Sequence, residues 1–151
     1  MIQLRERQKM IVRNILIAED IRFETGGKFS LMGIYGDSLD VNLPADAPDT
    51  CSTALSLVSF VTLEHTQSDS VPGDYNIQIV AGLSATEIFN MNARIESPAR
   101  GGIFHLPTPK FTFQVAEADI LKIHVVITTR EAFVATGSAT LAINIRRAPP
   151  G

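Results

Sequence analysis

The sequence predicts an all-β fold: an antiparallel two-sheet β-sandwich of about eight strands with Greek-key-like links. Three observations predict it. Apolar residues alternate with polar ones along most segments, which is the period of a strand. Turn-forming residues recur at nearly regular spacing, and no segment carries a convincing helical pattern longer than one turn. A closed β-barrel is the alternative, because a strand count does not decide whether a sheet closes.

Length and composition indicate one domain. The chain has 151 residues, 13 of them basic and 16 acidic, for a net charge of −3. We expect a flexible polar N-terminal arm at 1–9, a single sandwich domain at 10–147 and a C-terminal tail at 148–151. The acidic balance disfavours nucleic-acid binding, which usually leaves a basic footprint.

The same composition bears on location. Cys51 is the only cysteine, so no disulfide framework is expected. The charged start MIQLRERQK lacks the apolar centre of a signal peptide, and no run approaches the roughly 18 apolar residues of a membrane span. We expect a cytoplasmic protein, or a component of a virion or other particle, with no membrane contact.

Residues 11–35 predict two long strands joined by a charged turn. In the second strand one face carries Phe29, Leu31, Gly33 and Tyr35, and the other Lys28, Ser30, Met32 and Ile34. Gly26 and Gly27 permit the positive φ of a tight reversal. In the first strand, the run Ile15-Leu16-Ile17-Ala18 favours a buried strand over a helix.

This hairpin carries a motif. The acidic pair Glu19-Asp20, Arg22 and Glu24 precede the segment GGKFSLMGIY at 26–35. The pattern resembles the opening of a family of small uncharacterised bacterial and phage proteins with a β-sandwich domain of unknown function. The resemblance covers about the first quarter of the chain. It implies the fold and a bacterial or phage ancestry, and it implies no activity, because the family offers no catalytic residues to carry over.

Residues 37–50 predict a long connection that crosses from one sheet to the other. Pro44 and Pro48 cannot donate to a sheet ladder. The segment also holds four aspartates, whose spacing favours a solvated loop over a calcium site: Asp37, Asp40, Asp46 and Asp49.

The middle of the chain predicts three strands. Residues 52–63 are apolar on both faces, which is typical of a central strand or of one covered on its outer side by a partner. After a turn at 65–73, residues 75–81 and 89–95 alternate cleanly and form a meander.

Residues 97–109 predict a second irregular stretch, bounded by prolines and containing apolar side chains. Such side chains lie either under the loop or against a partner. Together with the N-terminal arm, this stretch gives the candidate interaction surface: Arg5, Arg7, Arg100, Ile103, Phe104, His105 and Leu106.

The remaining residues predict three further strands, near 111–115, 121–127 and 133–146. The last strand places Phe133, Ala135 and Gly137 on one face. Its small residues near Gly137 indicate a bend or the close approach of another segment.

No catalytic constellation is found, so we expect no enzyme, no cofactor and no metal centre. His65, His105 and His124 are expected in two turns and on the outer face of a strand, without ligand spacing. Glu19 and Asp20 point to opposite faces of a strand and cannot share a proton. No serine has the glycine-flanked elbow of a hydrolase, and Cys51 has no cationic neighbour in the sequence.

The sequence therefore favours a non-catalytic structural or interaction module that assembles with itself or with a partner protein, as a component of a phage or secretion-type particle. The alternative is a β-sandwich that binds a small ligand or carbohydrate through Tyr35, Tyr75 and the loop histidines. This alternative is weaker, because sugar sites use exposed aromatic platforms and the chain has no Trp and only two Tyr.

Overall fold

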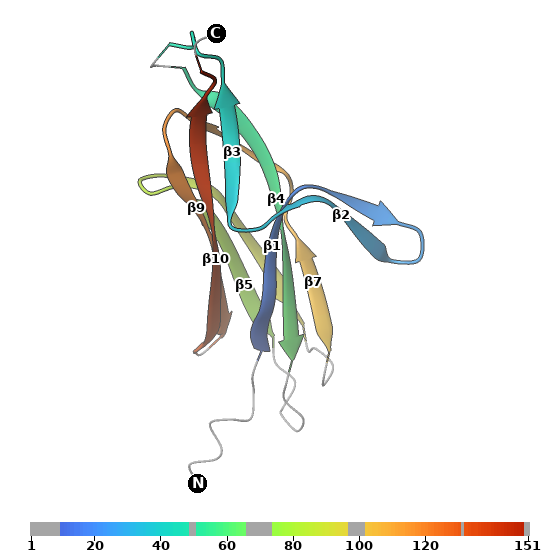
Figure 1. The fold of residues 1–151 in the computed structure, drawn as a ribbon. Helices are drawn as coiled ribbons and strands as arrows, with labels where there is room; N and C mark the ends of the chain where they lie inside the picture. Colours follow the sequence, from blue (N-terminus) through green and yellow to red (C-terminus); the bar gives the residue numbers. More distant parts are fainter. Residues whose placement is uncertain (1–9, 49–50, 66–73, 97–101, 131, 150–151) are drawn as a thin grey trace.

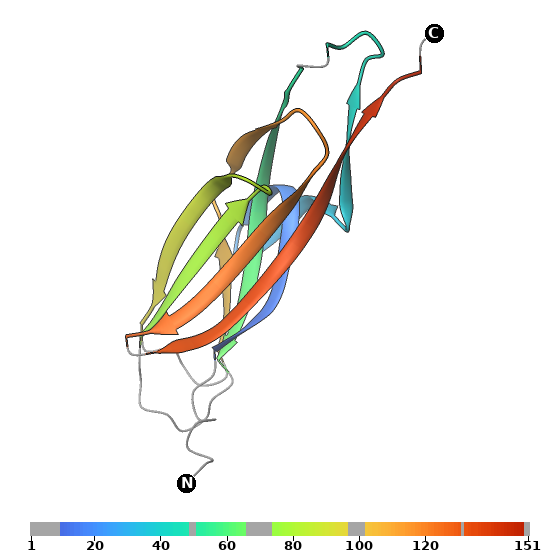
Figure 2. The same ribbon diagram turned by 90° about the vertical axis from the view of Figure 1, so that its left-hand side faces the viewer.

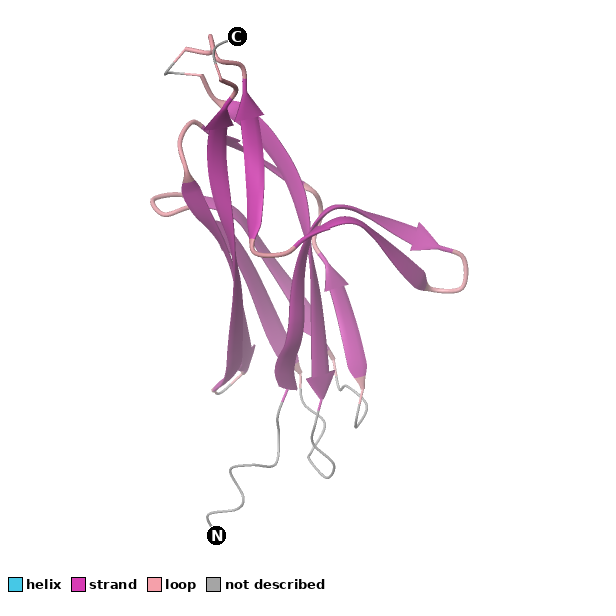
Figure 3. Cartoon of the chain, viewed as in Figure 1, coloured by secondary structure: helices cyan, strands magenta, loops and turns pink. Residues whose placement is uncertain are grey.

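A computed structural model describes residues 10–48, 51–65, 74–96, 102–130 and 132–149. These residues form ten strands in two sheets, as the all-β sandwich prediction requires (Figures 1 and 3). In chain order the strands are β1 Met10–Glu24, β2 Lys28–Tyr35, β3 Ser38–Leu43, β4 Thr53–His65, β5 Tyr75–Gly82, β6 Glu87–Ile95, β7 Ile103–Pro107, β8 Phe111–Val115, β9 Asp119–Thr129 and β10 Phe133–Arg147.

Each sheet contains five strands and stays open at its edges (Figure 2). The first has the order β2-β1-β4-β7, and β8 also pairs with β4. β8 pairs with the N-terminal half of β4, and β7 pairs with the C-terminal half. The second sheet has the order β3-β10-β9-β5-β6. Every pairing is antiparallel except that of β3 with β10, which is parallel. The described strands therefore form a sandwich and not a closed barrel.

The core lies between the sheets and is made by every second residue of most strands. In β9 the inward residues are fully buried β-branched or leucine side chains, while Lys122 lies on the outer face. Such side chains pack well on a pleated surface, which is why these segments form strands. The inward row of β9 is Leu121, Ile123, Val125 and Ile127.

The predicted strands of the middle and end of the chain are confirmed, including the meander of β5 and β6. β4 is central, with β1 on one side and β7 and β8 on the other, as the apolar pattern on both of its faces predicted.

Two strands were missed because turn-forming residues mask them. The predicted connection 37–50 contains β3, whose inward residues Leu39, Val41 and Leu43 are buried. The predicted irregular stretch 97–109 contains β7, which pairs with β4. Prolines and aspartates are depleted in strands, so a short segment that contains them is predicted as a loop. Pairing with a neighbouring strand, which the sequence pattern does not show, holds the segment extended. His65 was likewise predicted in a turn but is the last residue of β4.

The prediction for Gly137 is confirmed as a close approach. A Cβ at this position would lie 2.8 Å from Cβ of Val12, so β1 and β10 approach each other at the glycine. The prediction for Phe133 is wrong: the pairing of β10 with β9 shifts register between Phe133 and Ala135, and Phe133 is exposed.

Candidate protein-interaction surface

The hairpin formed by β1 and β2 projects from the sandwich (Figure 1). Ala18 is the last residue of β1 that pairs with both neighbours, Ile34 of β2 and Val58 of β4. Beyond Ala18, β1 pairs with β2 alone. We call residues 19–34 the hairpin arm. The predicted long hairpin is therefore confirmed, and it extends past the sheet to which it belongs.

Glycines shape the arm at its tip and near its root. Glu24 pairs with Lys28, and Gly26 and Gly27 between them have φ of 83° and 73°, as the tight reversal requires. Gly33 has φ of 65° and faces Glu19 across the ladder. A Cβ on Gly33 would lie 2.7 Å from Cδ of Glu19. Because Gly33 has no side chain, the Glu19 side chain can lie over β2 at this position.

Glu19 accepts a hydrogen bond of 3.1 Å from the hydroxyl of Tyr35. Partial burial raises the pKa of Tyr35 above its ordinary value of 10.0, and the hydrogen bond and negative charge of Glu19 raise it further. The phenol therefore stays protonated at neutral pH and serves as a donor at the root of the arm.

An aromatic cluster fastens the arm to the sheet beneath it. The ring of Phe29 lies 5.2 Å from Phe60 of β4 and 6.0 Å from His105 of β7, both edge to face. His105 stacks on Phe60 at 5.2 Å, and its Nδ1 lies 3.1 Å from the hydroxyl of Thr62. Aromatic pairs of this kind add about 0.5–1.5 kcal/mol each beyond their buried area.

The cluster explains the apolar outer face of β4. Val58 and Phe60 point away from the core, yet Val58 is 3% exposed and Phe60 8%. Phe29 of the hairpin arm covers Phe60, on a face where the apolar pattern also allowed a partner protein. An ion pair between Asp20 and Lys110, 3.6 Å apart and exposed, adds little to this contact.

The arm leaves large apolar side chains in solvent. Phe23 is 71% exposed, Ile34 54% and Met32 40%. Among the described residues, these are half of the exposed large apolar side chains; the others lie singly on β7, β9 and β10: Ile103, Ile120 and Phe133. Scattered apolar residues are ordinary on a protein surface. Met32 and Ile34 share one face of the hairpin, and Phe23, which pairs with Phe29, lies on the other. Apolar side chains exposed on both faces of a projecting hairpin indicate a contact region.

The predicted interaction residues are not gathered at one place. Arg5, Arg7 and Arg100 lie outside the described residues, as do the N-terminal arm and residues 97–101. Ile103 is exposed, but Phe104 and Leu106 are half-buried and pack against the core. His105 belongs to the cluster that fastens the hairpin arm.

Phe23, Met32 and Ile34 were missed as surface residues. The sequence contains an indication of this exposure, because both faces of the second strand carry apolar residues. A hairpin that leaves its sheet can bury only one of its two faces, so the apolar residues of the other face lie in solvent.

The described residues show where the candidate metal ligands and the tyrosines of the ligand-binding hypothesis lie. They include no group of three or more His, Cys, Asp or Glu side chains that could hold a metal ion. The three histidines lie on β4, β7 and β9, two of them in strands where turns were predicted. Tyr75 is 1% exposed, so it cannot offer the aromatic platform that the ligand-binding hypothesis required.

Comparison with known proteins gives no family. No protein-family description matches the chain, and no curated protein matches it. Among solved structures, the chain is similar to the N-terminal domain of PorA, with 11% sequence identity, a TM-score of 0.30, and coverage of 91% of this chain and 100% of that one. A likeness at this level carries no argument about function. Within the described part of the chain, no helix is long and apolar enough to cross a membrane.

Proposed function

We propose that the chain is a non-catalytic interaction module that assembles with itself or with a partner protein, as a component of a phage or secretion-type particle. The observation that carries the proposal is the hairpin arm, which is held on the sandwich by Phe29 and presents Phe23, Met32 and Ile34 to solvent. The residues that carry the family resemblance, Glu19 to Tyr35, are those of the arm and its root.

The build of the arm supports this proposal. Holding a hairpin away from its sheet gives up the burial that normally stabilises strands, and a two-stranded hairpin is marginal by itself. The cluster around Phe60 and the Glu19–Tyr35 hydrogen bond offset that loss. A surface fixed in advance loses less entropy on binding than one that must first become ordered.

The test is native mass spectrometry of gently purified protein and of three variants. The arm variant is Phe23→Ser/Met32→Ser/Ile34→Ser. The matched control is Ile120→Ser/Phe133→Ser, which removes exposed apolar side chains outside the arm. Ile103→Ser tests the surface predicted from the sequence without disturbing the core-facing Phe104 and Leu106.

We expect the wild type to form a discrete oligomer or a stoichiometric complex with a protein, the arm variant to lose it, and the control to keep it. Association that survives in the arm variant and disappears with Ile103→Ser would move the function to β7. A monomer that carries a bound small molecule or metal would replace the proposal with the ligand-binding hypothesis.

A further inference from the structure

The free edge of β2 is less protected against strand pairing than the other sheet edges of the described chain. The opposite end of its sheet is made by β7 and β8, each of five residues, with Pro107 and Pro109 where one follows the other. Short strands and prolines are devices that prevent an edge from pairing with another chain.

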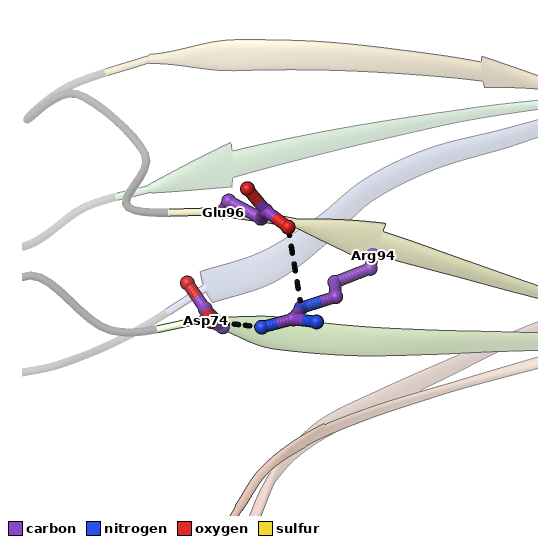
Figure 4. Close-up of polar contacts among 3 residues, drawn as sticks. All are labelled: Asp74, Arg94 and Glu96. Carbon is purple, nitrogen blue, oxygen red and sulfur yellow. Dashed lines mark hydrogen bonds and ion pairs between the residues drawn. The ribbon is translucent and has the colours of Figure 1, made fainter.

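The two edges of the second sheet carry charge. β3 has Asp40 at its centre, bound to Asn144 at 3.1 Å and to Arg146 at 3.1 Å. β6 has Arg94, which is paired with Asp74 and lies 3.7 Å from Glu96 (Figure 4). Charged edge residues oppose the approach of another strand because pairing would desolvate them.

β2 contains no proline, and its one charged residue, Lys28, is the first residue of the strand. From Phe29 to Tyr35 it contains no charged residue and no proline, and its residues Phe, Leu, Met, Ile and Tyr favour extended structure. Only Gly33, in the left-handed conformation, interrupts the regular edge. The segment from Lys28 to Met32 therefore offers unpaired backbone groups to a further strand.

The charges of the arm select an occupant. Its tip carries two basic residues and one acidic residue, Arg22, Lys28 and Glu24. Its root carries the acidic Glu19, Asp20 and Asp37, of which Asp20 is paired with Lys110. A second arm lying antiparallel to the first would set the basic tip of each copy beside the acidic root of the other. A parallel arrangement would set tip against tip and root against root.

We propose that β2 pairs antiparallel with β2 of a second copy of this chain, about a twofold axis near Leu31. The result is a four-stranded ribbon in the order β1-β2-β2-β1 that bridges two sandwiches. The inference rests on the proposed function and names its partner.

The arrangement accounts for the exposed Met32 of the β2 edge. The two Met32 side chains lie on the same face as diagonal neighbours across the axis, a distance that long side chains span. Phe23 lies on β1, one strand away from the new β2–β2 contact. Because the interface is isologous, every contact between different residues occurs twice, whereas the contact of the two Met32 side chains occurs once.

The first measurement is sedimentation equilibrium of the full chain between about 1 and 100 µM, the range in which moderate interfaces associate. We expect a species of twice the 16.4 kDa chain mass. Met32→Lys brings two like charges together near the axis and should weaken dimerisation at least about tenfold. Ile120→Lys introduces the same charge at an exposed apolar residue outside the arm and should leave dimerisation unchanged.

The second measurement is a disulfide scan in a Cys51→Ser background, with cysteine at Ser30, Leu31, Met32 or, as a control, Ile120. A twofold axis through β2 predicts a sharp maximum of cross-linking at one of the three β2 positions and none at Ile120. Equal cross-linking at all four positions, or a dimer insensitive to Met32→Lys, overturns the proposal.

The outcomes separate this inference from the proposed function. A wild type that stays monomeric at 100 µM, yet binds another protein that the arm variant loses, overturns the pairing of two copies and retains the interaction module. A monomer that binds no protein in either experiment overturns both.

Discussion

Substituting Gly137 by alanine should destabilise the sandwich, although alanine normally suits an ordered segment better than glycine. The new Cβ would lie 2.8 Å from Cβ and 2.9 Å from Cγ1 of Val12, closer than carbon atoms approach in folded proteins. Overpacking of this kind costs about 1–3 kcal/mol, against a gain of about 0.4–1 kcal/mol from the less flexible unfolded chain. We expect a net loss of about 1–2 kcal/mol.

Urea unfolding, followed by circular dichroism, measures the loss, and a double-mutant cycle identifies its cause. Val12→Gly/Gly137→Ala moves the side chain from one strand to the other and should be more stable than the two single costs predict, by about 1 kcal/mol. Gly36→Ala is the control, because a Cβ there meets nothing within 4 Å. A neutral Gly137→Ala, or strictly additive effects in the cycle, would show that β1 and β10 are not in contact at this point.

Two further predictions concern the surface. Hydrogen bonds from the hydroxyl of Ser84 at 2.5 Å and from the amide of Ile120 at 2.7 Å lower the pKa of Asp119 below its ordinary 3.8. The stability that Asp119 contributes is therefore present above pH 3.8 and is lost as the pH falls through the lowered pKa. Asp119→Asn should be less stable than wild type near neutral pH, and the difference in unfolding free energy should shrink in acid. A difference that grows in acid would contradict this reasoning. Phe29→Ala should loosen the hairpin arm without unfolding the sandwich, because Phe29 contacts Phe60 and His105. Hydrogen exchange should show faster amide exchange at 20–32 and unchanged exchange in β9. Phe23→Ala removes a ring that is 71% exposed and should have a smaller effect; equal effects would argue against the aromatic anchor.

The sequence was most informative where one face of a strand is buried. The alternation in β5, β6 and β9 predicted both the strands and their inward residues, because burial imposes a period of two. β3 and β7 lacked this clarity. Asp40 and Pro107 are poor strand residues, and it is pairing with β10 and β4, far away in the sequence, that holds these segments extended.

The interaction surface was only partly predictable for a related reason. The pattern at 28–35 shows apolar residues on both faces but does not show that β1 leaves its sheet after Ala18. The pairing of β1 with β4 ends at Ala18 and Val58, and beyond that point the arm is held by the contact of Phe29 with Phe60. Phe104 and Leu106 illustrate the converse: they were expected in a loop, and the pairing of β7 with β4 turns them toward the core.

The parallel pairing of β3 with β10 delays completion of the second sheet during synthesis of the chain. Asn144 donates to Asp40 across 104 residues of sequence, and within the described chain β3 pairs only with Ala142 to Arg147 of β10. At about 5–20 residues per second, synthesis of that interval takes roughly 5–20 s. Throughout that time the apolar row of Leu39, Val41 and Leu43 has no sheet to join. The edge strand β3 therefore joins its sheet only after β10 has been synthesised, and loss of a few residues near Arg147 would leave part of β3 without its partner.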